Sequence, residues 1–334
     1  MCCAIPIEEE ELDKDSIRGM DETPLPYRRL FRPNDRQIIQ IRDEFPALGR
    51  WFNNKPIVYF DNACSTLRPR PVIDALTSYY EDSAGCHGRV NHHFGQETTL
   101  AYNCARSQVQ EYIGALFPSE VIFVRNTTEA INMVANMFSL AEGDVVLTSD
   151  LEHNSNLLPW QMLREKKGIE HRIFKTRDDT SFDRASFEAA LDDGVKLVSV
   201  LLSSNLSGAS FPVKEIIEKA HAVGARVLVD AAQGMLYQDV NVQELDVDFM
   251  AFSGHKLLGP TGTGVLYVKQ ELMEELPTFL MGGETVIDTT YTGYTLGGAP
   301  DRFEAGLQDY AGAVGLGAAC LYLSGIGKPF IRDQ

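Results

Sequence analysis

The feature of this sequence that most restricts its fold is a regular alternation of short apolar runs with longer helix-like stretches. The runs expected to form strands are 121–124, 145–148, 197–202, 226–229, 249–252 and 264–268. The stretches expected to form helices are 71–80, 99–116, 128–138, 156–167, 186–191 and 213–223. Strands that alternate with helices indicate βαβ units, whose crossover helices cover both faces of the sheet. The sequence therefore predicts an α/β fold with a mostly parallel sheet.

Polar clusters follow four of the predicted strands, at 125–129, 203–205, 230–233 and 253–256. Ligands of such sheets bind at the carboxyl ends of the strands, where loops lead into helices. Each cluster has a simple explanation when taken alone, because an Asp or Thr before a helix commonly serves as its cap. Four clusters at one edge of one sheet favour a single binding site.

The residue types in these clusters meet the needs of pyridoxal 5′-phosphate. This cofactor requires a lysine for a Schiff base and a carboxylate on its pyridine nitrogen, and Lys256 and Asp230 supply them. Thr128 stands at a predicted helix N-terminus, where backbone N–H groups and the helix dipole attract a phosphate. Ser253 and His255 can complete the phosphate cup from the loop of the lysine.

Six motifs in this order resemble the class V aminotransferase family, specifically its group II cysteine desulfurase and selenocysteine lyase branch. They are YFDNA at 59–63, NTTEAIN at 126–132, EHN at 152–154, DAAQ at 230–233, SGHK at 253–256 and RFEAG at 302–306. The resemblance runs from about residue 58 to the C-terminus. It implies a fold-type I transferase with a seven-stranded, mostly parallel sheet, working as a homodimer with the site at the subunit interface.

The same resemblance implies a role for each matching residue. Lys256 would also shuttle the α-proton of the substrate, and His153 would stack on the cofactor ring. Asn205 and Gln233 would hydrogen-bond the side of the ring that carries the phenolic oxygen. Thr127 and Thr128 would hold the phosphate with Ser253 and His255, helped by the partner's segment matching 291–298. Arg89 and His92 would line the substrate entrance, in the loop 85–93.

The activity that this resemblance implies is conversion of L-cysteine to L-alanine, with transfer of sulfur to a thiol acceptor for iron–sulfur clusters or another sulfur supply. A sulfur-acceptor protein is an expected partner. Family members carry the accepting cysteine, and an arginine for the substrate carboxylate, in a small C-terminal domain beyond the last residue of this chain. The sequence thus predicts that this domain is truncated.

Two cysteines of this chain are alternative acceptors. Cys64 stands beside the expected substrate, and Cys86 lies in the entrance loop, where a nearby imidazole or cation lowers a thiol pKa. Equally, Cys64 can be a small buried residue and Cys86 a spectator. Selenocysteine lyase activity on L-selenocysteine, another class V lyase or epimerase, and a catalytically incomplete remnant that binds the cofactor all remain alternatives.

Composition excludes several other classes. A net charge of −17 argues against a nucleic-acid partner, since such proteins present a basic face to phosphates. The six cysteines form no CxxC pair, so no metal site is expected. The acidic start of the chain does not resemble a targeting segment, and no apolar run approaches the ~20 residues that span a bilayer. We therefore expect a cytoplasmic protein without membrane association.

Four regions are expected along the chain. Residues 1–33 form an acidic arm, and 34–65, with a helix at 34–45, contribute to the small domain and the site. Residues 66–300 form the large cofactor-binding domain, and 301–334 begin the truncated C-terminal domain.

Overall fold

A computed structural model describes residues 35–88 and 91–334, so the arm expected at 1–33 lies outside the described residues. The chain divides after Tyr59 into two compact units. In the first unit, helix α1 (Asp35–Asp43) is followed by the 3-10 turn η2 (Pro46–Gly49) and by the strands β1 (Trp51–Phe52) and β2 (Lys55–Pro56). These two strands pair with each other in antiparallel fashion. None of the helices within the described ranges is long and apolar enough to cross a membrane.

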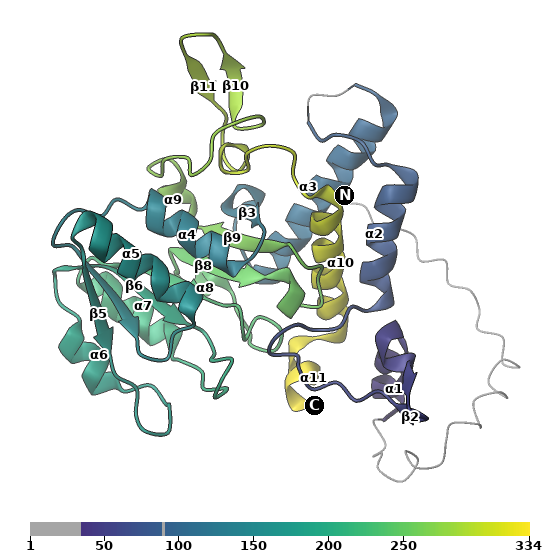
Figure 1. The fold of residues 1–334 in the computed structure, drawn as a ribbon, viewed down its shortest axis with the longest axis horizontal. Helices are drawn as coiled ribbons and strands as arrows, with labels where there is room; N and C mark the ends of the chain where they lie inside the picture. Colours follow the sequence, from purple (N-terminus) through teal and green to yellow (C-terminus); the bar gives the residue numbers. More distant parts are fainter. Residues whose placement is uncertain (1–34, 89–90) are drawn as a thin grey trace, which may run out of the picture. The chain divides into compact units, whose positions relative to one another are not determined.

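The second unit, Phe60–Gln334, is built on a sheet that has seven strands in the part of the chain that the structure describes (Figure 1). The strand order is β3-β9-β8-β7-β6-β4-β5. The strands are β3 (Val121–Val124), β4 (Val145–Ser149), β5 (Glu170–Phe174), β6 (Val195–Leu201), β7 (Arg226–Asp230), β8 (Phe249–Ser253) and β9 (Gly264–Val268). Strand β9 runs antiparallel to both of its neighbours, and the other pairs are parallel. The predicted α/β fold with a mostly parallel sheet is confirmed.

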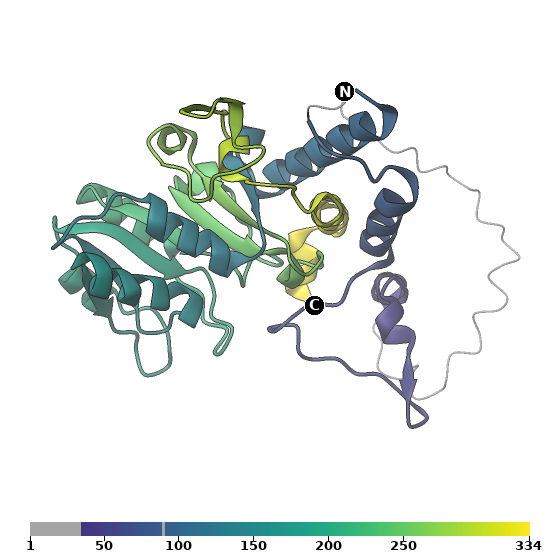
Figure 2. The same ribbon diagram turned by 45° about the horizontal axis from the view of Figure 1, so that its top comes forward.

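Helices cover both faces of this sheet, as expected for parallel strands joined by crossovers (Figures 1 and 2). Helices α4 (Thr127–Met137) and α5 (Leu158–Lys167) lie on one face. Helices α6 (Arg184–Ala190), α7 (Val213–Ala222) and α8 (Val242–Leu245) lie on the other. In α7 the buried residues are Val213, Ile216, Ile217 and Ala220, a spacing that puts one apolar stripe of the helix against the sheet.

A group of long helices beside the sheet consists of α2 (Arg70–Asp82), α3 (His93–Ile113) and α10 (Tyr310–Ile326), and the short α11 (Lys328–Asp333) follows (Figure 2). Small residues let α10 approach α3 closely. A Cβ atom on Gly317 would lie 2.8 Å from the Cα atom of Ala105, so only glycine fits there. Helix α3 begins at His93 rather than at the expected residue 99. The His92 side chain caps it early, because its Nδ1 atom accepts a hydrogen bond from the Gly95 N–H.

Three strands of this unit were not predicted from the sequence. Strand β5 is at the edge of the sheet, and most of its side chains are at least partly exposed, so it has no apolar run to reveal it. Strands β10 (Val286–Thr289) and β11 (Tyr294–Leu296) form a hairpin that projects from the rest of the unit (Figure 1). The short helix α9 (Gln270–Met273) precedes the hairpin.

The RFEAG motif at 302–306 stabilises the fold through the side chain of Glu304. The carboxylate of Glu304 is buried and accepts hydrogen bonds from both Nη atoms of Arg106 at 2.8 Å. It also accepts from the hydroxyl of Tyr102 at 2.7 Å and from the Phe123 N–H at 2.6 Å. The segment that follows the hairpin is thereby fastened to α3 and β3.

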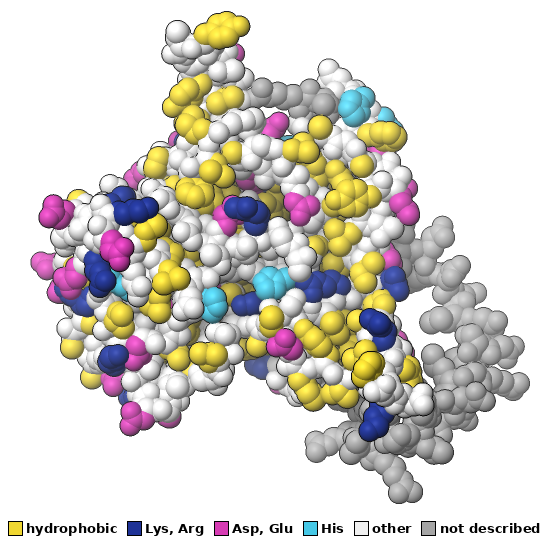
Figure 3. Space-filling model, viewed as in Figure 1, with side chains coloured by type: hydrophobic (Ala, Val, Ile, Leu, Met, Phe, Trp, Pro, Cys, Tyr) yellow, Lys and Arg dark blue, Asp and Glu magenta, His cyan; other side chains and the backbone are white. Residues whose placement is uncertain are grey.

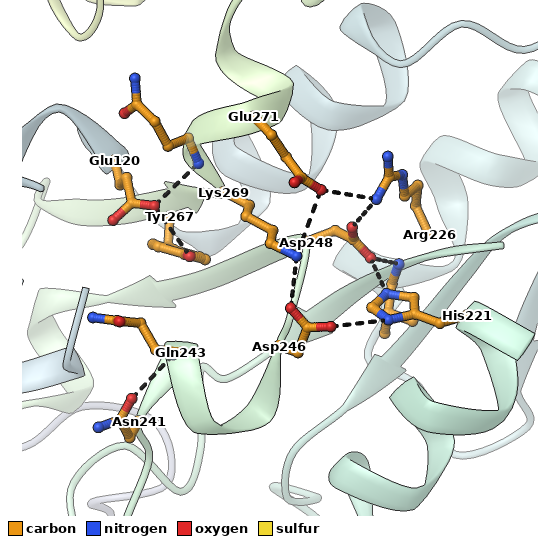
Figure 4. Close-up of polar contacts among 12 residues, drawn as sticks. Glu120, His221, Arg226, Asn241, Gln243, Asp246, Asp248, Tyr267, Lys269 and Glu271 are labelled. Carbon is orange, nitrogen blue, oxygen red and sulfur yellow. Dashed lines mark hydrogen bonds and ion pairs between the residues drawn. The ribbon is translucent and has the colours of Figure 1, made fainter. Parts of the chain in front are cut away.

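Ionic contacts fasten the end of the sheet where β7 and β8 begin (Figure 4). The buried Asp248 accepts hydrogen bonds from His221 Nε2 at 2.7 Å, Arg226 Nη1 at 2.9 Å and the Val227 N–H at 2.8 Å. Lys269 donates to Asp246 at 2.6 Å beside them. Across residues 35–88 and 91–334, no group of three or more His, Cys, Asp or Glu side chains could hold a metal ion. The contacts of Asp248 join the start of β8 to β7 and α7. A cavity lies at the opposite edge of the sheet, where these strands end.

Candidate active site

A cavity of about 590 Å³ lies at the carboxyl edge of the parallel strands, a volume typical of small-molecule sites. It is lined by the loops that follow β3, β4, β6, β7 and β8, as expected for a ligand site in such a sheet. Its lining includes all the residues assigned to the cofactor from the sequence: Thr127, Thr128, His153, Asn205, Asp230, Gln233, Ser253, His255 and Lys256. The fold thus brings these residues to one place.

Lys256 and Asp230 come from neighbouring parallel strands. Asp230 is the last residue of β7, and Lys256 ends the 3-10 turn η5 (Gly254–Lys256) directly after β8. The carboxylate of Asp230 is buried and accepts a hydrogen bond from the Ala232 N–H at 2.9 Å. Burial raises its pKa, and the hydrogen bond from the Ala232 N–H and the nearby positive charge of Lys256 counteract this rise. The cavity therefore contains an amine together with a buried carboxylate.

Donors for an anion gather at the start of helix α4. The side chain of Asn126 caps the helix by accepting from the Glu129 N–H at 2.9 Å. The Thr127 N–H donates to Ser253 Oγ at 2.9 Å, and the two hydroxyl groups are 2.7 Å apart. A helix N-terminus and two hydroxyl groups form a cradle that suits a phosphate group.

The orientation of His153 depends on a serine that the sequence reasoning missed. Ser155 donates its N–H to His153 Nδ1 at 3.1 Å, so Nδ1 is an acceptor and the neutral ring carries its proton on Nε2. The hydroxyl of Ser155 also lies 2.7 Å from that of Thr128. Ser155 thus joins the imidazole to the start of α4. The sequence offered one indication of this role. Ser155 follows His153 by two residues, a spacing at which serine commonly forms local hydrogen bonds.

Glu152 is a second residue whose role the sequence did not reveal, although it lies in the EHN motif. Its buried carboxylate accepts hydrogen bonds from Ser149 Oγ at 2.6 Å, Asn156 Nδ2 at 2.8 Å and the Leu201 N–H at 3.0 Å. Burial raises its pKa to about 8. These bonds tie the loop that carries His153 to strand β6.

The remaining predicted residues occupy varied positions. Gln233 donates from Nε2 to the carbonyl oxygen of Ala63 at 2.8 Å, and it thereby supports the segment that carries Cys64. Cys64 is exposed and lines the cavity. Cys86 and His92 instead line a different cavity of about 510 Å³, between α2 and the start of α10, and Arg89 lies outside the described residues. Within one described chain, the fold does not bring Cys86 and His92 to Lys256.

The donors present fit a phosphorylated pyridine aldehyde. The amine of Lys256 can bind an aldehyde, the buried Asp230 can pair with a ring nitrogen, and the start of α4 can hold a phosphate. On the face shown in Figure 3, histidine and basic side chains lie near the centre, and acidic side chains lie both beside them and toward the edges. The cavity itself is lined by Lys256, His153 and His255 and by the acidic residues Asp61 and Asp230, so its charge is more balanced than the net charge of −17 of the chain.

Residues 58–334 match the family model described as Aminotransferase class-V. The chain belongs to this family. Pyridoxal 5′-phosphate is the cofactor of its members and of this chain. The seven-stranded, mostly parallel sheet expected from the resemblance agrees with this assignment.

Two relatives and one solved structure that resemble this chain are all named cysteine desulfurases. It is 43% identical to a cysteine desulfurase of Synechococcus elongatus, in an alignment of 87% of this chain and 47% of that protein. It is 42% identical to a cysteine desulfurase of Dickeya dadantii, over 88% of this chain and 73% of that protein. The apo structure of the cysteine desulfurase from Thermococcus onnurineus superposes with a TM-score of 0.84 and 37% identity, over 91% of this chain and 74% of that one. The chain thus spans about half of the Synechococcus relative and about three quarters of the other two.

Proposed function

We propose that this class V enzyme is a cysteine desulfurase, which converts L-cysteine to L-alanine and transfers the sulfur to a thiol. The observation that carries the proposal is the placement of Lys256, Asp230 and the start of α4 around one cavity. The names of the similar proteins support cysteine as the substrate. Selenocysteine lyase activity is the second candidate, because it needs the same cavity and acts on the same carbon skeleton.

Each residue of the cavity has a proposed task. Bound pyridoxal phosphate supplies an electron-withdrawing ring that stabilises negative charge on the α-carbon of the substrate. Asp230 holds a proton on the pyridine nitrogen, and Lys256 Nζ takes and returns the α-proton. Thr127, Thr128, Ser253 and His255 bind the phosphate, His153 lies against the ring, and Asn205 and Gln233 border its phenolic oxygen.

Transfer of sulfur from cysteine to a thiol needs no outside oxidant. A thiolate attacks the sulfur of the substrate, and the bond between Cβ and sulfur breaks with its electron pair retained on the carbon side. The carbon takes up one proton, so that cysteine and a thiol give alanine and a persulfide.

A homodimer is part of the proposal. Large apolar side chains are exposed on the projecting hairpin β10–β11, among them Ile287, Tyr291 and Tyr294. Contact with a second copy would remove this surface from water, which favours association. The partner's segment 291–298 would then help to close the phosphate cup, and His92 would line the substrate entrance. A cytoplasmic location stays a prediction.

The products distinguish the candidate activities. We expect the purified protein, loaded with pyridoxal phosphate and supplied with L-cysteine and a reducing thiol, to release alanine and sulfide in equal amounts. Product analysis by amino-acid chromatography and a sulfide assay would check this. Pyruvate and ammonia in place of alanine would identify a lyase, and D-cysteine would identify an epimerase. Alanine from L-selenocysteine but not from L-cysteine would assign the chain to the selenocysteine lyases.

Cys64 is the proposed sulfur acceptor when no other thiol is supplied. Of the cysteines in the described residues, it is the one that lines the cavity, whereas Cys320 is buried, which raises its pKa to about 12 and keeps it protonated. After incubation with L-cysteine alone, peptide mass spectrometry is expected to find one added sulfur on Cys64. Cys64→Ser should abolish this label, and the matched variant Cys86→Ser should keep it, since Cys86 is also exposed but lines another cavity. A persulfide on Cys86 and none on Cys64 would contradict the assignment.

A further inference from the structure

Thr66 is a buried residue that contacts the backbone on both sides of Lys256. Its N–H and its hydroxyl both donate to the carbonyl oxygen of His255, each at 2.9 Å. The same hydroxyl oxygen accepts a hydrogen bond from the Leu258 N–H at 3.0 Å. One side chain from a distant part of the sequence therefore connects the residue before Lys256 with the second residue after it.

The backbone that this hydroxyl supports is strained. Leu258 has a φ angle of +60°, in the left-handed region that a side chain with a Cβ atom rarely adopts. Such a conformation persists only where the surroundings hold it in place. The Leu258 side chain is buried, and its N–H is held by Thr66. On the other side of the loop, the Gly254 N–H donates to the Thr263 carbonyl oxygen at 2.8 Å.

The segment that leads to Thr66 also lines the cavity. Asp61, Ala63 and Cys64 come shortly before Thr66 in the sequence, and they line the cavity together with His255 and Lys256. Gln233 holds this segment from the side through the carbonyl oxygen of Ala63. The hydroxyl of Thr66 thus joins the lysine loop to the chain segment that contains Cys64.

We propose that Thr66 is a positioning residue for Lys256. Its hydroxyl fixes the path of the backbone on both sides of the lysine, so that the amine is directed into the cavity before any cofactor arrives. This inference rests on the proposed role of Lys256 as the cofactor lysine. A preorganised amine lowers the entropic cost of binding, so loss of the hydroxyl should weaken cofactor binding and not only turnover.

Thr66→Val tests this, because valine has nearly the same shape and lacks the hydroxyl, while Thr66→Ser keeps it. Each apo-protein would be titrated with pyridoxal phosphate, with absorbance as the readout and borohydride reduction followed by peptide mapping to locate the attachment. We expect Thr66→Val to raise the Kd for pyridoxal phosphate about fivefold to twentyfold, because both hydrogen bonds of the hydroxyl are lost. Thr66→Ser should remain within about twofold of the wild type, since its hydroxyl still serves both partners. Thermal melting of the apo-proteins would check that they fold.

Hydrogen exchange supplies a readout that needs neither turnover nor cofactor. In the wild-type apo-protein the Leu258 amide should be protected, and in Thr66→Val the peptide covering residues 255–259 should exchange faster while the rest of the sheet does not. Rapid exchange of Leu258 in the wild type would overturn the proposal even if Thr66→Val failed to fold.

Other outcomes separate this inference from the proposed function. If Lys256→Ala removes the absorbance of the bound cofactor but Thr66→Val binds it with unchanged affinity, only the role of Thr66 is refuted. If Thr66→Ser is as weak as Thr66→Val, the hydroxyl is not responsible and the inference again fails. If Lys256→Ala keeps the absorbance, the assignment of Lys256 itself is wrong.

Discussion

Replacing Lys256 with alanine is expected to abolish the yellow colour of the loaded protein and to reduce turnover of L-cysteine at least about a thousandfold. The variant loses the amine that binds the cofactor aldehyde and that moves the α-proton. The cavity, the phosphate donors at α4 and the buried Asp230 would remain, so cofactor could still bind without the covalent bond. Absorbance spectra and alanine release measure the two effects separately.

Lys196→Ala is the matched control for this experiment. Lys196 is exposed on β6, and its Nζ atom donates to the nearby carbonyl oxygen of Asp193 at 3.2 Å. Its removal should leave both the colour and the rate unchanged. Retention of colour in Lys256→Ala, with loss of colour in another lysine variant, would show that the cofactor is attached elsewhere.

Replacing Asp230 with asparagine is expected to reduce turnover about 10²-fold to 10³-fold, while the colour remains because Lys256 is intact. Asparagine has nearly the same shape but no charge, so it cannot hold a proton on the pyridine nitrogen, and the ring withdraws electrons less well. The rate of alanine formation at saturating L-cysteine measures the loss. An unchanged rate would contradict the proposed pairing of Asp230 with the ring.

The same substitution should not weaken the apo-protein. Burial raises the pKa of Asp230 above its ordinary value, so the folded protein binds a proton on this carboxyl group more tightly than the unfolded chain does. The ionised carboxylate therefore costs folding free energy once the pH rises through that raised pKa, and asparagine removes this cost. Asp248→Asn is the contrasting control, because Asp248 is equally buried but is held by Arg226 and His221. It should lower the melting temperature and leave the turnover of the folded fraction unchanged.

Several parts of the fold were predictable because their signal is local. The central strands are buried on both faces and therefore read as apolar runs, and the helices between them carry apolar stripes. The edge strand β5 and the hairpin β10–β11 were missed for the opposite reason, since their side chains face water and leave no such pattern. Helix α3 was predicted too short because its cap is a histidine, which is not among the usual capping residues.

The sequence by itself determined six of the seven strands of the sheet, the edge that carries the cavity and the family, and it singled out Lys256 and Asp230. Parallel strands all end at the same edge of the sheet. Polar residues that directly follow such strands therefore meet at that edge, and the order of strands and polar clusters in the sequence is enough to predict the site. The tertiary structure alone decided which side chains support them. Thr66 meets the lysine loop, Ser155 joins His153 to Thr128, and Gln233 supports Ala63. These contacts join segments far apart in the chain or depend on the path of a loop, and no spacing in the sequence encodes such distances.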